Sequence, residues 1–102
     1  MPVPPKEVQL AAQRALEARD NVPPSRKAGT LVGLARANQL ARGENISENT
    51  LLRMHSYLSR AKSAYDAAKA KGLDAESSKA IQAYGLWGGQ AALAWVRREL
   101  NK

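Results

Sequence analysis

The longest regular pattern in the sequence is a stripe of apolar side chains spaced by three and four residues. Its members are Leu51, Met54, Leu58, Ala61, Tyr65 and Ala68. This spacing places them on one face of an α-helix, because a helix completes a turn in about 3.6 residues. Ser47 can cap the start of such a helix, and Gly72 can end it. The pattern therefore predicts one long amphipathic helix over residues 48–71.

Proline and glycine divide the rest of the chain into shorter helical segments. Helical spacing predicts helices over residues 6–20, 31–42 and 90–100, and another that starts at Ser77 or Ser78. The inner face of the 31–42 helix is expected to carry Leu31, Leu34, Ala35 and Asn38. No strand is predicted, because β-branched residues are scarce and do not alternate. We therefore expect one all-α domain over residues 1–102, a compact bundle of four to five helices around one long central helix.

A glycine-rich stretch precedes the last predicted helix. Two adjacent glycines inside a helix would destabilise it by about 1 kcal/mol each relative to alanine. Gly88 and Gly89 are therefore expected to form a tight turn between the last two helices. The chain contains no phenylalanine, so we expect Trp87 and Trp95 to be mainly buried as core volume, although exposed tryptophans can also stack on bases.

The residues that usually carry chemistry are sparse. Cysteine is absent and His55 is the only histidine, so we predict no metal site, no cofactor and no catalytic residues. The apolar runs are too short to span a membrane. The first residues lack the basic and apolar regions of a signal peptide, which favours a cytosolic protein. An enzyme is the least favoured class.

The charge balance favours an anionic partner. Sixteen Lys and Arg against nine Asp and Glu give a net charge of +7, which attracts nucleic acid, with DNA favoured, or an acidic protein surface. Arg26 and Lys27 are the first candidates for contact, because a short loop between Pro24 and Gly29 should present both to solvent. The remaining candidates lie on predicted helices that can extend the same face: Arg36, Arg53 and Arg60. A solvated face without a partner is the alternative.

The helices over 31–42 and 48–71 also suggest a helix-turn-helix motif. In that arrangement Asn49, Thr50 and Arg53 would face the major groove. The connection is slightly long, and the second helix is much longer than a recognition helix, so the indication is weak. A protein that instead docks on a larger assembly should expose an apolar patch.

Three sequence blocks resemble small proteins encoded by tailed bacteriophages. The first is the run from Gly29 to Ala37, Gly-Thr-Leu-Val-Gly-Leu-Ala-Arg-Ala. The second consists of Ile46-Ser47, Thr50, Arg53-Met54 and Ser56-Tyr57, and the third is Leu86-Trp87-Gly88-Gly89. In order, the blocks run from Gly29 to Gly89, and the resemblance extends over about residues 24 to 95. Together they are fairly specific, although each block alone is not.

The resemblance implies a phage setting, with an accessory or virion-associated role in the host cytoplasm or the virion, and no established activity. The sequence departs from the family pattern at two places. Gln90 stands where several relatives carry an acidic residue, and Ala61 follows Arg60 where a histidine is frequent. Two functional classes follow. One is a non-enzymatic protein whose basic surface contacts nucleic acid or another anion, and the other is an interaction protein that docks on a phage or host assembly.

Overall fold

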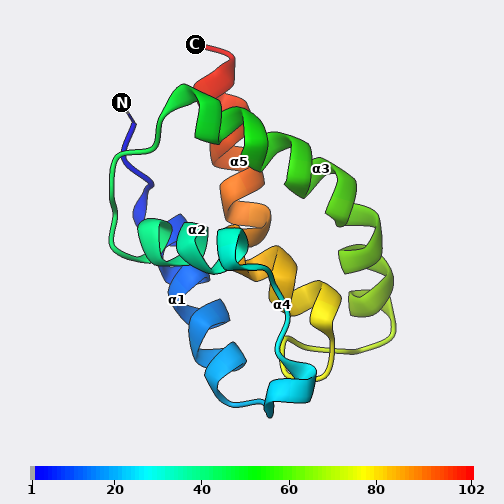
Figure 1. The fold of residues 1–102 in the computed structure, drawn as a ribbon. Coiled ribbons are helices and arrows are strands. Elements are labelled where there is room, and N and C mark those ends of the chain that lie inside the picture. The colour runs from blue at the N-terminus through cyan, green and yellow to red at the C-terminus, as the bar shows by residue number, and fades with distance from the viewer. Residues whose placement is uncertain (1) are drawn as a thin grey trace.

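The computed structural model describes residues 2–102 and contains five α-helices and one short 3-10 helix (Figure 1). The elements are α1 (Lys6–Asp20), η1 (Pro24–Arg26), α2 (Leu31–Ala41), α3 (Glu48–Ala70), α4 (Lys79–Leu86) and α5 (Gly89–Leu100). The described residues contain no strand, and the all-α prediction is confirmed. The helix bounds agree with the predicted ranges to within one or two residues.

Hydroxyl side chains cap three of the helices. Thr30 accepts a hydrogen bond from the Gly33 N–H at the start of α2, and Ser47 accepts one from Thr50 at the start of α3. Ser78, rather than Ser77, caps α4 by accepting from Ile81. These bonds satisfy N–H groups that have no partner inside the helix.

The shortest α-helix occupies the centre of the packing. α4 packs against all four other α-helices, whereas α3 packs mainly against α4 and α5. In Figure 1, α1 lies at the left and α3 at the right, with α4 and α5 between them. The long helix therefore forms one side of the bundle. This differs from the sequence prediction, which placed it at the centre. Its stripe still points inward, since Leu51, Met54, Leu58 and Ala68 are buried.

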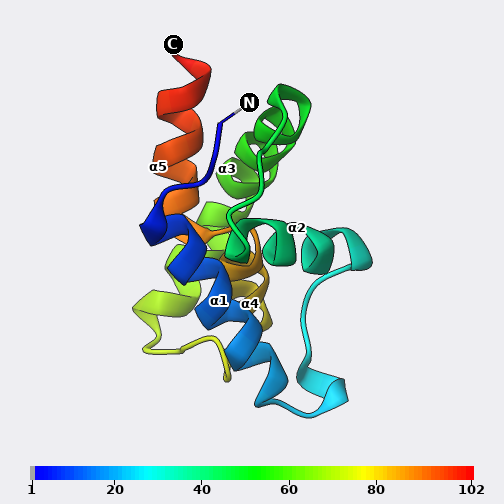
Figure 2. The same ribbon diagram turned by 90° about the vertical axis from the view of Figure 1, so that its left-hand side faces the viewer.

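α2 differs most from the sequence prediction. Its buried residues are Gly33, Arg36, Ala37 and Leu40, which lie nearly opposite the predicted inner face. Leu31 is 86% exposed and Ala35 is exposed, while Leu34 and Asn38 are half-buried. The small residues Gly33 and Ala37 let α2 lie close to its neighbours. Figure 2 shows the N-terminal end of α2 extending away from the other helices.

The predicted turn between the last two helices is present. Gly88 and Gly89 have φ values of 95° and 62°, in the left-handed region that glycine adopts without a steric cost. Trp95 is buried, as predicted, with 4% of its surface exposed. Trp87 is only half-buried, and it lies in the region where the predicted contact arginines meet.

Candidate anion-binding surface

The five predicted contact residues fall into two groups. Arg36 lies on α2, and Arg53 and Arg60 lie on α3, whereas Arg26 ends η1 and Lys27 follows it directly. In Figure 1, η1 is at the lower end of the molecule, well below α2 and the first half of α3. The single basic face that the sequence suggested is therefore divided into two.

The α2 and α3 group gathers around two aromatic rings. The rings of Tyr57 and Trp87 are stacked, with centroids 4.7 Å apart and an angle of 21° between their planes. The guanidinium carbon of Arg36 lies 5.6 Å from the centroid of Trp87. Arg53 and Arg60 are spaced by four and three residues from Tyr57, so all three share one side of α3. We call these five residues the arginine–aromatic cluster.

A glycine allows the cluster to be compact. A Cβ atom at Gly33 would lie 3.2 Å from Nε1 of Trp87, which is tighter than ordinary packing. The missing side chain at Gly33 therefore lets the indole ring approach α2 closely, and Arg36 one turn later covers part of it. The group that approaches α2 at Gly33 is the Trp87 side chain.

Arg36 is packed against protein instead of standing in solvent. Only 9% of it is exposed, and its Nη1 donates a hydrogen bond to Oε1 of Gln39. Its Nε is the single buried side-chain nitrogen or oxygen in residues 2–102 that has no hydrogen-bond partner. Burial lowers the pKa of Arg36 from its usual value, and the positive charge of Arg53 lowers it further.

The arginines of the cluster have no acidic neighbour along the two stretches of sequence that contribute them. The sequence contains no Asp or Glu from Asn21 to Gly43, nor from Asn49 to Tyr65. The ion pairs in the described chain are Arg42–Glu44, Lys62–Asp66, Arg98–Glu7 and Lys102–Glu99, so none involves a predicted contact residue. Arg60 uses its Nε to donate to the Ser56 carbonyl oxygen at 3.2 Å. The positive charge of this surface is therefore available to an external anion.

The sequence suggested that Lys27 is presented to solvent, but the structure shows it held against the protein. It is half-buried, and its Nζ donates to the Arg19 carbonyl oxygen near the end of α1. Arg19 in turn donates from Nε to the Ala28 carbonyl oxygen at 3.1 Å. Lys27 therefore fastens the loop to α1, because its ammonium donates to a carbonyl oxygen in the last turn of that helix. Arg26 is exposed, as expected.

Sequence reasoning missed Gln82, which fixes this loop. Gln82 on α4 is 1% exposed. Its Oε1 accepts from the Ala28 N–H at 2.8 Å, and its Nε2 donates to the Ala75 carbonyl oxygen at 2.9 Å. One buried amide thus connects α4 to the segments before α2 and after α3. In the sequence, its position between the apolar residues Ile81 and Ala83 of a predicted helix is the one sign that Gln82 is buried.

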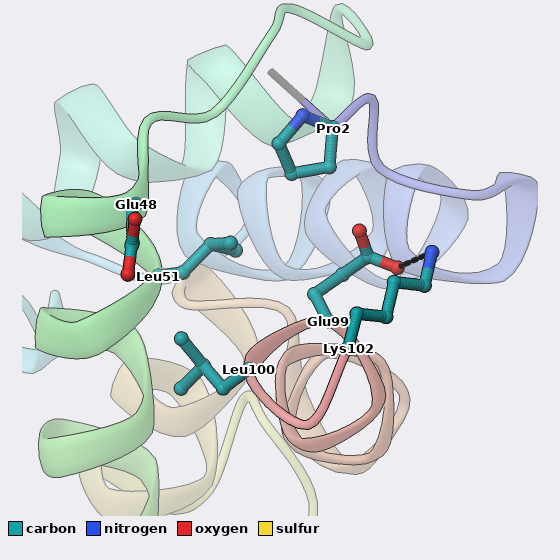
Figure 3. Close-up of a pocket in the computed structure, with 6 residues that line it drawn as sticks. All are labelled: Pro2, Glu48, Leu51, Glu99, Leu100 and Lys102. Atoms are coloured by element: carbon teal, nitrogen blue, oxygen red, sulfur yellow. Dashed lines mark ion pairs between the residues drawn. The ribbon is translucent and has the colours of Figure 1, made fainter.

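Two cavities lie outside the cluster, and the first is small. It has a volume of about 220 Å³ between the start of α3 and the end of α5 (Figure 3). The carboxylates of Glu48 and Glu99 line it, but Glu99 is paired with Lys102 at 2.7 Å. Binding sites for small molecules usually enclose about 300–1,000 Å³. Neither its size nor its side chains indicate a ligand.

The second cavity is larger, at about 400 Å³, and borders α1, α3, α4 and α5. Tyr65 and Tyr84 stack beside it with ring centroids 4.3 Å apart. The buried Tyr84 hydroxyl donates to Oε1 of Gln90 at 3.0 Å, so no buried side-chain donor remains open there. Its cations, Arg14 and Lys69, are exposed. This cavity therefore offers weaker recognition than the arginine–aromatic cluster.

Other kinds of site find little support in the described chain. His55 is half-buried on α3, and residues 2–102 contain no group of three or more His, Cys, Asp or Glu that could hold a metal ion. Within the same residues, no helix is long and apolar enough to cross a membrane.

A helix-turn-helix pair is not formed. α2 packs mainly on α1 and α4, whereas α3 packs on α4 and α5, so the two helices do not pack closely on each other. Asn49 and Arg53 are exposed, but Thr50 is half-buried and takes part in the cap with Ser47. Trp87 separates α2 from α3, which explains why the expected motif is absent.

Comparisons with protein-family models, with curated proteins and with solved structures find no match for this chain.

Proposed function

We propose that the protein is a non-enzymatic binding protein that contacts nucleic acid, with DNA favoured, through the arginine–aromatic cluster. The observation that carries the proposal is the placement of Arg36, Arg53 and Arg60 around two aromatic rings, with no acidic side chain in either contributing stretch. The resemblance to tailed-bacteriophage proteins supports an accessory or virion-associated role for this activity, which we propose for the host cytoplasm or the virion.

Arginine suits this task chemically. Its planar guanidinium donates parallel hydrogen bonds to phosphate oxygens and keeps its charge at all physiological pH values. Such contacts carry no base preference by themselves, so we expect binding that depends little on DNA sequence. Arg26 lies apart from the cluster and forms a second contact region. Lys27 holds the loop to α1 and is not a contact residue in this proposal.

A gel-shift titration tests the proposal. Wild type should bind duplex DNA at about 50 mM salt and lose much of its affinity at about 200 mM, because phosphate neutralisation releases counterions. The double variant Arg53→Gln with Arg60→Gln should reduce the salt slope by about two units, near 0.9 for each lost phosphate contact. If wild type shifts no DNA at either salt concentration, the nucleic-acid proposal is wrong.

A specific observation supports docking on another protein as the second candidate. Leu31 and Val32 are adjacent on α2 and are 86% and 54% exposed. Exposed apolar residues of this kind often mark a protein interface. Docking through them would depend little on salt and would be lost in Leu31→Ser, whereas DNA binding would survive that substitution.

A further inference from the structure

One edge of the Arg36 guanidinium has no hydrogen-bond partner in the protein. Its Nη1 donates a hydrogen bond to Oε1 of Gln39, and its Nε has no hydrogen-bond partner. Nε and Nη2 lie on the same edge of an arginine, and this edge binds two oxygens of an oxyanion side by side. Nη2 also makes no hydrogen bond but is not among the buried unpartnered atoms. Nη2 therefore reaches the surface, where an anion can approach, and Nε lies buried behind it.

The surroundings of Arg36 hold this edge in place without neutralising it. Trp87 lies against the guanidinium at 5.6 Å and is itself stacked on Tyr57, and such a contact attracts a cation to the ring face. Arg53, one turn before Tyr57 on α3, adds a second positive charge, and its repulsion contributes to the lowered pKa of Arg36. The free protein thus brings two cations together, and neither of them is in an ion pair.

A purely structural role does not account for this arrangement. A buried charge without a partner destabilises a protein, and replacing buried ionic groups by apolar residues of similar volume is often neutral or stabilising. Methionine would fill the space beside Trp87 without an open donor and without repulsion from Arg53. An anion bound at this edge gives the unpaired donor a hydrogen-bond partner and offsets the repulsion from Arg53.

We propose that Arg36 and Arg53 form a binding site for one phosphate group beside the stacked rings of Trp87 and Tyr57. The inference rests on the proposed function, in which this phosphate belongs to the nucleic-acid backbone. Arg36 supplies the fixed donor edge, and Arg53 supplies a second charge from the neighbouring helix. Two guanidinium groups offer more donors than the two oxygens of a carboxylate can accept, whereas a phosphate presents further oxygens.

Titration with inorganic phosphate tests the site separately from DNA binding. The ionic strength is held constant with chloride, and the Arg36 Nε–Hε and Trp87 Nε1–Hε1 resonances are followed by NMR. In wild type we expect both resonances to shift and to reach saturation. In Arg53→Gln the same titration should give at least tenfold weaker binding. Arg98→Gln, a change in an exposed arginine on α5, should leave the titration unchanged. Shifts that do not saturate, or that persist in Arg53→Gln, overturn the proposal.

A second pair of variants separates binding from packing. Arg36→Met should abolish the Trp87 response to phosphate while its Tm stays equal to or above that of wild type. Arg36→Lys should keep the charge but lose at least tenfold in affinity, because lysine lacks the two-donor edge. A large fall in Tm in Arg36→Met, with a normal response in Arg53→Gln, would show that Arg36 is a packing residue and would sink the inference.

Two further measurements identify the anion: a titration with acetate, and a comparison of phosphate binding with DNA binding. Acetate at the same ionic strength should shift the two resonances much less than phosphate does; an equal response would overturn phosphate as the preferred group. DNA binding without a phosphate response means that the site is wrong while the proposed function stands. A phosphate response without any DNA binding supports the site and contradicts the proposed function.

Discussion

Tyr84 is the residue whose burial has the clearest consequence for pH dependence. It is fully buried, and burial, together with smaller contributions from Tyr65 and Asp66, raises the pKa of its hydroxyl from 10.0 to about 12. The folded chain thus holds this proton more tightly than the unfolded chain. Its contribution to stability is complete below pH 10 and is lost as the pH rises towards about 12.

We therefore predict that the free energy of unfolding falls between about pH 10 and pH 12, measured by urea denaturation at a series of pH values. Tyr84→Phe should be less stable at neutral pH, because Gln90 loses its donor, but its stability should decline less over this alkaline range. Absorbance of the phenolate should show a tyrosine that titrates near pH 12 in wild type and is missing in the variant. Identical alkaline profiles would contradict the assignment.

The two turn glycines allow a second prediction at the same scale. An alanine at either position is strained by its positive φ, at about 1–2 kcal/mol. At Gly88 a Cβ would also lie 2.4 Å from the Cβ of Ala92, whereas at Gly89 it meets nothing within 4 Å. Gly88→Ala should therefore destabilise the fold clearly more than Gly89→Ala. Gly72→Ala, with φ of 79° and open space, serves as the control and should resemble Gly89→Ala in urea unfolding.

At the scale of the element, periodicity located the helices better than it oriented them. The stripe on α3 was read correctly because large apolar residues dominate one side of it. On α2, by contrast, the buried side contains Gly33, Ala37 and Arg36, which carry little or no apolar signal. Leucines at positions 31 and 34 suggested the opposite face. The contacts of α2 depend on Trp87 and on small residues, and no local pattern reports such partners.

The observed orientation of α2 predicts contrasting effects of two leucine substitutions. Leu40 is fully buried and Leu31 is 86% exposed. Leu40→Ala should destabilise the protein by about 2–5 kcal/mol, because it leaves a cavity in the core. Leu31→Ser should change stability by less than about 0.5 kcal/mol. Thermal unfolding of both variants checks the orientation, and a larger loss at Leu31 would contradict it.

The same limit applies to the candidate site. Charge and loop position could identify Arg26, Lys27, Arg36, Arg53 and Arg60 as cations, but they could not tell which of them are free. Lys27 is held by a helix end that lies eight residues away in sequence. The cluster also depends on Trp87, which comes from beyond α3 and is brought to Arg36 by the packing of α4. A long-range contact of this kind leaves no pattern in a single sequence.

At the scale of the whole molecule, the net charge and the local cluster make separable predictions. The charge of +7 attracts any polyanion over a distance, and any two removed cations weaken this attraction alike. Direct contacts are specific to position. Replacing Arg53 and Arg60 by Gln, or Arg97 and Arg98 by Gln, lowers the charge by the same amount, from +7 to +5, and all four residues are exposed.

If the arginine–aromatic cluster contacts DNA, the Arg53 and Arg60 double variant should lose at least tenfold more affinity than the Arg97 and Arg98 variant. The reason is that only the first pair lies beside Tyr57 and Trp87, where a backbone phosphate can reach two helices at once. Fluorescence anisotropy with a labelled duplex, at one salt concentration and again at a higher one, measures both variants under identical conditions. Equal losses would mean that binding follows net charge alone, and the contact surface would then have to be sought elsewhere on the molecule.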